Sequence, residues 1–213
     1  MNCKIIDDKL NDKLHYKLND TFIVFDVETT GLPKSYGAPP TLYNLWPHIV
    51  QFSWIVYNKS IEEKSYIIKP KNYIIPDDSI KIHGITNEEA NKTGIDIEIV
   101  LDKFREDCSK VDYLVAHNAS FDISVVNSAC YRTKNELCFE KEKKVICTMK
   151  STVNLCKLEN KNIKYKNYKY PKLEELYEFL FLKKPNVKLH DSLEDTRLTL
   201  LCYQHLHSQN YFV

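Results

Sequence analysis

The chain has 213 residues, of which 43% are hydrophobic, and its formal net charge at pH 7 is +1. These values are typical of an ordinary globular protein with a full core and exclude a strongly basic protein that coats nucleic acid, although a local basic patch would serve an enzyme that grips a strand end. No run of about 18 apolar residues occurs, so no transmembrane helix is expected.

Residues 1–20 have no clear period and form a charged lead-in, whose opening MNCKIIDDKLNDKL does not resemble a secretory signal. The seven cysteines include no CxxC pair and no Cys/His spacing suited to zinc, so we expect reduced thiols in the core. These features predict one domain over residues 21–213, a cytoplasmic location and no membrane partner.

The first half of the domain is rich in predicted strands. TFIVFDVE (21–28) is apolar and β-branched and ends at a turn with Gly31 and Pro33. QFSWIVY (51–57) and SYIIK (65–69) predict a hairpin joined through the polar NKSIEEK.

The remainder alternates helices with short strands. Helices are expected at 75–86, ending near Gly84, and then at 86–94, 95–108, 119–131, 171–182 and 192–207, with strands at 113–117 and 145–148. This order predicts an α/β fold in which a mixed five-stranded sheet is flanked by helices.

Two carboxylates close the first strand. Asp26 and Glu28 are two residues apart, so both side chains project from one face. Aiming two carboxylates at one point is costly unless a cation lies between them. The alternative is an ordinary solvated strand end.

A third carboxylate, Asp122, lies in AHNASFD (116–122), where a strand gives way to a helix. A carboxylate at this place also fits a simple interaction with the helix dipole, and Asn118 is a plausible N-cap. Taken alone, the motif therefore has a sufficient structural explanation.

The last motif is HDSLEDT (190–196). Either Asp191 or Ser192 can cap the final helix, and capping-box spacing pairs Asp191 with Glu194 or Ser192 with Asp195. In each case a loop histidine, His190, precedes a carboxylate held about one turn inside the helix. Since imidazole titrates near neutral pH, such a histidine can accept a proton from an attacking water.

Four carboxylates scattered along the chain predict a shared cation site. Oxygen ligands favour Mg²⁺ or Mn²⁺ over zinc. Two such ions beside a histidine base are suited to phosphodiester hydrolysis, which indicates a nuclease.

Together the motifs resemble the DnaQ-like (RNase T-like) 3′→5′ exonucleases of the DEDDh subgroup, the group that contains the proofreading subunit of bacterial DNA polymerase III. The resemblance spans roughly residues 21–207 and includes WPHIVQ (46–51) and IHGIT (82–86). The family's HNxxFD pattern matches without a gap, and His190 and Asp195 fit its His-x₄-Asp motif. The tyrosine variant of that motif would need Tyr at 191, where the chain has Asp191.

The resemblance implies an RNase H-like sheet with the first strand at its centre. It implies that Asp26, Glu28 and Asp195 hold a catalytic Mg²⁺ or Mn²⁺, and that Asp26 bridges to a second ion near Asp122. His190 would activate the attacking water. The products would be nucleoside 5′-monophosphates.

The resemblance also implies a cleft for the 3′-terminal nucleotide. The protein backbone at Thr29, Thr30 and Gly31, which follow the first acid pair, would hold this nucleotide. Its base and sugar would lie against Leu32, Ile82 and His83. Asn118 and Phe121 would lie in the same cleft. Ordinary packing is an equal alternative for Leu32, Ile82 and Phe121.

Residues 157–172 combine six lysines with Tyr165, Tyr168 and Tyr170. Such a segment could bind a single strand through phosphate and stacking contacts, but a solvated loop is the simpler interpretation.

The sequence thus predicts a metal-dependent 3′→5′ exonuclease acting on single-stranded or frayed DNA ends, in proofreading or repair, with a DNA polymerase as a possible partner. Two alternatives stay open: an RNA-directed enzyme (RNase T-like or oligoribonuclease-like), and an inactive domain that only binds nucleic acid. All five catalytic positions are filled, which argues against the inactive domain.

Overall fold

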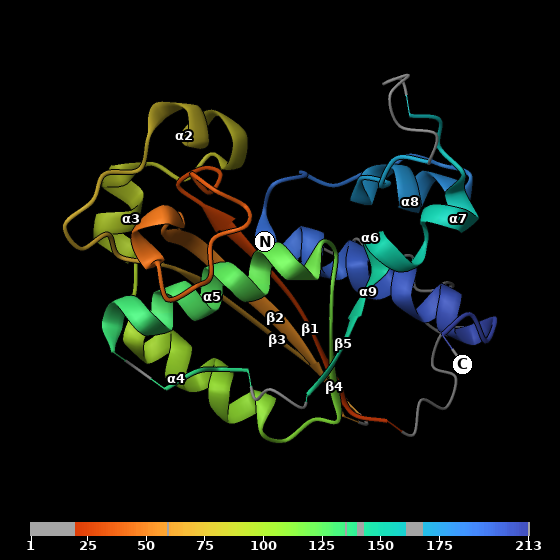
Figure 1. Cartoon of the computed structure of the whole chain (residues 1–213), viewed down its shortest axis with the longest axis horizontal. Helices are drawn as coiled ribbons and strands as arrows, with labels where there is room; N and C mark the ends of the chain where they lie inside the picture. The colour runs from red at the N-terminus through yellow and green to blue at the C-terminus, as the bar shows by residue number, and fades with distance from the viewer. Residues whose placement is uncertain (1–19, 59, 135, 140–142, 161–167, 213) are drawn as a thin grey trace.

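The computed structural model describes residues 20–58, 60–134, 136–139, 143–160 and 168–212 (Figure 1). The expected lead-in over residues 1–20 lies outside this range, apart from Asp20.

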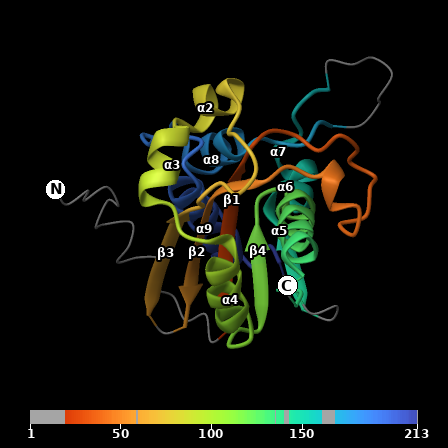
Figure 2. The same ribbon diagram turned by 90° about the vertical axis from the view of Figure 1, so that its left-hand side faces the viewer.

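Five strands form one mixed sheet in the order β3-β2-β1-β4-β5. They are β1 (Phe22–Thr29), β2 (Ile49–Tyr57), β3 (Ile61–Ile67), β4 (Tyr113–Ala116) and β5 (Lys144–Cys147). β1 pairs antiparallel with β2 and parallel with β4, while β3 and β5 form the edges. Figure 2 shows β3, β2, β1 and β4 side by side. The expected five-stranded mixed sheet with a central first strand is confirmed.

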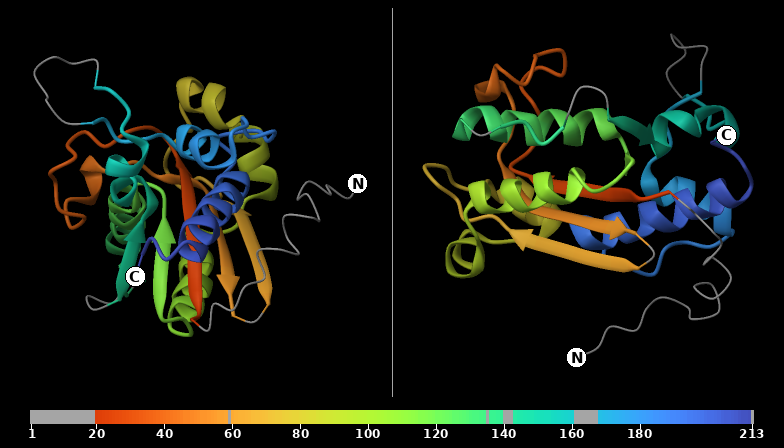
Figure 3. Two further views of the ribbon diagram at one scale, coloured as in Figure 1. Left: turned by 90° about the vertical axis from the view of Figure 1, so that its right-hand side faces the viewer. Right: turned by 90° about the horizontal axis from the view of Figure 1, so that it is seen from below.

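Helices cover both faces of this sheet. They are η1 (Tyr43–Leu45), α2 (Asp77–His83), α3 (Asn87–Thr93), α4 (Ile97–Cys108), α5 (Ala119–Thr133), α6 (Thr148–Ser151), α7 (Val153–Cys156), α8 (Leu173–Phe181) and α9 (Ser192–Ser208). α4 and α5 pack on one face and α9 on the other, as the two views of Figure 3 show.

Alternation along β1 divides the core in two. Ile23, Phe25 and Val27 pack in the cluster that includes residues of α4 and α5. Phe22 and Val24 pack in the cluster that includes Leu200 and Tyr203 of α9.

Asp26 and Glu28 continue the α9 face of β1. They share the parity of Phe22 and Val24, and side chains two residues apart on a strand lie on the same face. The strand therefore buries apolar residues against α9 along most of its length and presents carboxylates to the start of α9 at its end.

The hairpin differs from the prediction. β3 begins at Ile61, so NKSIEEK is not a loop and only residues 58–60 separate the strands. β3 is an edge strand, where charged side chains are tolerated. One of them, Lys64, was expected in the turn of the hairpin. It lies in β3 instead, and its ammonium donates to Asp107 of α4 at 2.6 Å.

Helices α6 and α7 were not predicted, because each has only four residues, which is too few to show the hydrophobic period of a helix. The other expected elements are present, with ends shifted by a few residues.

The cysteines of the described residues are free, and all except the half-buried Cys147 are buried, which confirms their expected role as core residues. The seventh, Cys3, lies outside the described part. Among the helices the structure describes, none combines the length and the apolar character required to cross a membrane.

Candidate active site

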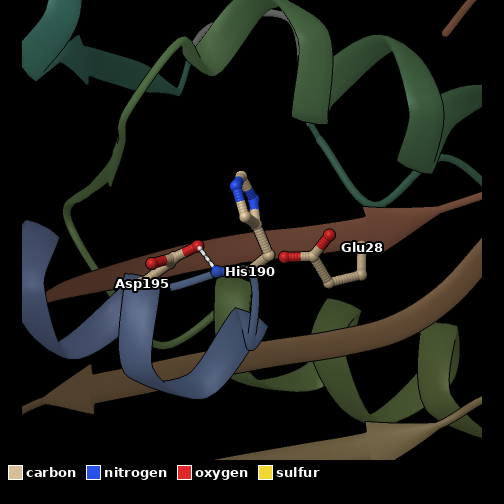
Figure 4. A group of neighbouring side chains, drawn as sticks. All are labelled: Glu28, His190 and Asp195. Atoms are coloured by element: carbon tan, nitrogen blue, oxygen red, sulfur yellow. Dashed lines mark hydrogen bonds between the residues drawn. The ribbon is translucent and has the colours of Figure 1, made fainter. Parts of the chain in front are cut away.

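Three of the predicted catalytic residues converge where β1 ends and α9 begins. Ligand atoms of Glu28, His190 and Asp195 all lie within 4.8 Å of one another. Figure 4 shows the two carboxylates on either side of His190. Glu28 and His190 are 162 positions apart in the sequence, and the packing of α9 on β1 brings them together.

The chain turns sharply at His190, which adopts a left-handed backbone conformation with φ 62°. Its backbone N–H donates to Oδ2 of Asp195 at 3.0 Å, while its side chain is exposed. Asp191 is the cap of α9, since its Oδ1 accepts from the N–H groups of Leu193 and Glu194 at 3.0 and 3.3 Å. Asp195 therefore holds the backbone of the histidine loop and leaves the imidazole free to act.

The start of α9 is locked onto β2. The backbone N–H of Ser192 donates to Oε1 of Gln51 at 3.0 Å, and the buried hydroxyls of Ser192 and Ser53 lie 2.6 Å apart. Gln51 and Ser53 are the register partners of Glu28 and Asp26. The same two positions of β2 therefore support the carboxylates of β1 and fix the helix that supplies Asp195.

The sequence analysis named Ser192 only as an alternative cap of the final helix, and it did not single out Gln51 or Ser53. A signal was present, because Gln51 and Ser53 are the polar residues of an otherwise apolar and aromatic run and lie two apart, on one face of the strand.

Asp122 lies in the first turn of α5 and is only 2% exposed. Asn118 occupies the cap position, but with φ 63° it makes no side-chain cap hydrogen bond, so its predicted capping role is wrong. A left-handed backbone replaces the extended conformation that a capping side chain needs. Asp122 is the charge that acts most strongly on Asp26, which joins it to the carboxylate cluster.

The carboxylates resist ionisation. Burial, and then repulsion by Asp122 and Asp195, raises the pKa of Asp26 well above its usual range. Burial and the same two neighbours raise the pKa of Glu28 to about 8. Burial raises the pKa of Asp122 to about 8, and burial raises that of Asp195 to about 7 although the hydrogen bond from His190 opposes the rise. A cluster that repels its own negative charge requires a cation to become fully ionised.

One further observation fits a divalent cation. Oδ1 of Asp195 is buried and has no hydrogen-bond partner among the described residues, whereas Oδ2 of the same carboxylate accepts from His190. A buried carboxylate oxygen without a donor is costly. Its neighbours are carboxylates, whose oxygens suit a hard divalent ion, so the residues present fit the expected metal.

The segment after β1 is held by hydrogen bonds at Thr29, Thr30 and Gly31. The Thr29 hydroxyl donates to the carbonyl of Gly31 at 2.7 Å, and Oγ1 of Thr30 accepts from the backbone of His48 at 2.9 Å. Gly31 has φ 134°, a conformation that other residues rarely adopt. This turn continues directly from Glu28, as the expected nucleotide contacts require.

The predicted cleft residues divide into exposed and buried groups. Leu32 and Ile82 are 74% and 56% exposed, so core packing does not account for them. Phe121 packs against the main core and near the ring of Trp46, which supports the packing alternative for this residue. Asn118 is half-buried at the start of α5.

His83 is buried, and its ring has one satisfied nitrogen. Nδ1 accepts from the backbone N–H of Ile85 at 3.1 Å, which assigns the proton to Nε2, and Nε2 has no partner among the described residues. Burial, followed by the charges of Lys188 and His190, lowers the pKa of His83. The neutral ring thus holds an unused donor close to His190.

Lys188 was not predicted and has no sequence signal. Its ammonium donates to the carbonyl of His83 at 3.1 Å and lowers the pKa of Glu28. It joins the loop that carries His190 to the C-terminal end of α2, so the two sides of the expected cleft are connected.

Comparison with known proteins agrees with this geometry. A sequence profile described as "Exonuclease" and named for RNase T matches residues 23–203. The chain is 33% identical over 183 residues, 85% of its length, to the PolC-type DNA polymerase III of Caldanaerobacter subterraneus subsp. tengcongensis, and covers 11% of that protein. It is 36% identical over 115 residues, 52% of its length, to the DNA polymerase III subunit epsilon of Buchnera aphidicola, and covers 46% of that protein.

The fold is similar to that of Escherichia coli exonuclease I in complex with a dA16 oligonucleotide. The TM-score is 0.67 at 18% identity, over 91% of this chain and 42% of the other. The chain spans only about a tenth of the PolC-type relatives and less than half of the other two proteins. The match over residues 23–203 covers most of the chain and confirms the resemblance found in its motifs. The chain belongs to the RNase T exonuclease family.

Proposed function

We propose that the protein is a metal-dependent 3′→5′ exonuclease that hydrolyses terminal phosphodiesters of single-stranded or frayed DNA ends and releases nucleoside 5′-monophosphates. The observation that carries this proposal is the convergence of Glu28, Asp195 and His190 within 4.8 Å beside two further carboxylates of raised pKa.

The carboxylates would hold two divalent ions, Mg²⁺ or Mn²⁺. Asp26, Glu28 and Asp195 would bind one, and Asp26 with Asp122 the other. When bound, such ions stabilise the negative charge that develops on the attacking and departing oxygens of a phosphodiester. The family implies dependence on a divalent metal, and the choice of Mg²⁺ or Mn²⁺ follows from the carboxylate ligand set.

His190 would serve as the general base. Its exposed imidazole is next to Glu28 and Asp195, and its backbone is tied to Asp195, so a ring nitrogen can accept the proton of the attacking water without the loop moving away.

The terminal nucleotide would lie against the Thr29–Leu32 turn. Leu32 and Ile82 offer exposed apolar surface for its base, and the buried His83 would support the wall of the cleft beside Ile82. Asn118 and Phe121 would border the same cleft.

DNA is favoured as the substrate because the matched relatives are DNA polymerase III proteins and the similar exonuclease I was solved with a DNA oligonucleotide. On the same ground, a DNA polymerase is a candidate partner in proofreading. An RNA-directed enzyme of the same mechanism is the alternative. The cytoplasmic location expected from the sequence stays a prediction.

The test uses 5′-labelled single-stranded DNA and RNA of the same sequence, with Mg²⁺, Mn²⁺ or EDTA. We expect a ladder that shortens from the 3′ end, is absent in EDTA and in Asp26→Ala, and persists in the exposed control Asp78→Ala. A stronger rate on RNA would replace the DNA assignment with the alternative. Absence of cleavage with either strand and either metal would overturn the proposal in favour of a binding domain.

A further inference from the structure

Two adjoining cavities begin at the turn that follows the active-site strand. The first, ≈ 310 Å³, is lined by Thr30 and Leu32 as well as Lys34. The second, ≈ 490 Å³, lies between β2, α4 and the end of α5. His48 and Arg132 line both, so the cavities meet at these two side chains and lead away from the site proposed for the terminal nucleotide.

Arg132 is a half-buried cation without an acidic partner. Its Nη2 donates to the carbonyls of Tyr43 and Trp46 at 2.8 and 3.1 Å, and the guanidinium lies over the Tyr43 ring at 5.8 Å. Arg105 and Arg197, by contrast, both pair with carboxylates. Within the described residues no carboxylate reaches Arg132.

A guanidinium in this position needs an anion. It stays charged even where burial lowers its pKa, and its remaining N–H groups form a planar fork that matches a phosphate or carboxylate. A partly desolvated charge without a counter-charge is unfavourable, so a bound anion would relieve a cost already present in the fold.

The charge around Arg132 is predominantly positive. Lys69 and Lys134 are exposed on the wall of the larger cavity, and neither forms a salt bridge with a described residue. Lys71 is paired with Asp96, and Glu98 is the acidic residue of the lining. Lysines of this kind add affinity for a polyanion without demanding one fixed geometry.

A flat aromatic wall completes the junction. The rings of His48 and Tyr73 stack at 3.9 Å with an interplanar angle of 14°, and the Tyr73 hydroxyl donates to the carbonyl of Ile49 at 3.1 Å. Burial, assisted by the charge of Arg132, lowers the pKa of His48 to about 4, so this imidazole is neutral at physiological pH. A rigid uncharged pair of rings beside a cation suits a nucleobase next to its phosphate.

We propose that Arg132 and the two cavities form a binding site for the phosphodiester backbone of the substrate strand on the 5′ side of its terminal nucleotide. This inference rests on the proposed function, because the smaller cavity shares Thr30 and Leu32 with the terminal-nucleotide site. It assigns Arg132 to a phosphate, the rings of His48 and Tyr73 to a base, and Lys69 and Lys134 to more distant phosphates.

Arg132 also has a structural role, since it ties α5 to η1. Two variants therefore separate substrate binding from folding. Arg132→Gln removes the charge from the junction, and the double variant Lys69→Ala/Lys134→Asn removes two exposed charges. Lys134 is the C-cap of α5 with φ 58°, and Asn tolerates this left-handed conformation better than Ala does. Lys103→Ala, an exposed lysine of α4 outside both cavities, is the matched control.

The experiment compares oligothymidylates of increasing length with the p-nitrophenyl ester of thymidine 5′-monophosphate, which fills only the terminal-nucleotide site. For Arg132→Gln we expect KM to rise about tenfold on long strands, with a smaller effect as the substrate shortens and the least effect on the ester. The dependence of log KM on log salt should become shallower by about 0.7 for each phosphate that the variant no longer neutralises. The double lysine variant should shift in the same direction, and Lys103→Ala should match the wild type.

The inference would be overturned if Arg132→Gln raised KM equally for the ester and for long strands. It would also be overturned if neither Arg132→Gln nor the double lysine variant raised KM. Fluorescence anisotropy of a labelled oligothymidylate in Ca²⁺ gives a readout that is independent of turnover. If the wild type binds the strand and cleaves nothing, the proposed function fails while weaker binding by Arg132→Gln still supports the cavity site. If Arg132→Gln binds as tightly as the wild type, the cavity site is rejected whatever the turnover.

Discussion

The hydroxyls of Ser53 and Ser192 lie 2.6 Å apart and both residues are fully buried. This bond joins the strand next to β1 to the first residue of α9. Since Asp195 follows one turn later, the distance between the carboxylates of β1 and α9 depends on this contact.

Replacing Ser192 with Ala should therefore reduce both stability and rate. Ser53 keeps its bond to Ser65 at 2.8 Å, so the expected cost is about 1–3 kcal/mol in the free energy of unfolding by urea. Displacement of Asp195 should lower kcat by up to about 10²-fold. Ser208→Ala, in the exposed last turn of the same helix, is the control and should change neither quantity. An unaltered kcat in Ser192→Ala would show that the bond does not position Asp195.

His190→Ala should lower kcat by about 10²–10⁴-fold, the usual contribution of a general base, and leave metal affinity close to that of the wild type. Calorimetric titration with Mn²⁺ beside steady-state kinetics measures the two quantities. His207→Ala, at the far end of α9, is the matched control. Loss of metal affinity in step with kcat would instead make His190 a metal ligand, a role that its distance to Glu28 and Asp195 also allows.

The metal-free protein should lose stability as the pH rises. Glu28 and Asp122 have pKa values of about 8 in the folded state, above the unfolded value of about 4. The folded state then binds more protons than the unfolded state between these limits, so the stabilising effect is complete below about pH 4 and is lost as the pH rises through about 8.

Melting temperatures across this range, in EDTA and in Mg²⁺ or Mn²⁺, check the prediction. The rise in melting temperature that the metal causes should become larger as the pH increases, because the ions bind ionised carboxylates. Asp26→Asn should flatten the EDTA profile by removing one charge from the cluster. A metal-free protein whose melting temperature rises over the same interval would contradict the assigned pKa shifts.

Gly94→Ala should be strongly destabilising for steric reasons. A Cβ there would lie 2.2 Å from the carbonyl oxygen of Ala90 and 2.6 Å from the backbone nitrogen of Lys69, and backbone atoms cannot move aside as side chains do. We expect the free energy of unfolding to fall by about 3 kcal/mol or more. The melting temperature should fall by about 2–4 °C for each kcal/mol lost. Gly37→Ala has open space around its Cβ and should stay within about 0.5 kcal/mol of the wild type. Similar melting temperatures for the two variants would disprove the crowding.

The strands of the sheet could be predicted because they depend on local signals. The resemblance of the motifs implied that Glu28, His190 and Asp195 lie together, and the structure brings these three residues together. Alternation marks β1, and the spacing of Asp26 and Glu28 determines their common face whatever the tertiary structure. His190 and Asp195 likewise belong to one loop and one helical turn.

Features that depend on contacts across the chain were not predictable in the same way. The early start of β3 depends on its pairing with β2, and Lys64 finds its partner on α4. The guanidinium of Arg132 is held by carbonyls almost ninety residues away in the sequence. The expected cap at Asn118 failed because its backbone is left-handed, with φ 63°, whereas a capping side chain needs an extended backbone. The middle of the Lys/Tyr-rich segment, residues 161–167, lies outside the described residues, so its predicted character as a solvated loop stays a prediction.

Because side chains alternate along β1, the carboxylate cluster can form only when this strand pairs with β2 in the correct register. If β1 slipped by one residue against β2, Phe22 and Val24 would exchange faces with Ile23 and Phe25, and Asp26 and Glu28 would turn toward the apolar side that α4 and α5 cover. Such a misfolded chain would lose its core and its carboxylate cluster in one step. With the proposed activity, the chain could cut nucleic acid only after its central strand has found the correct register.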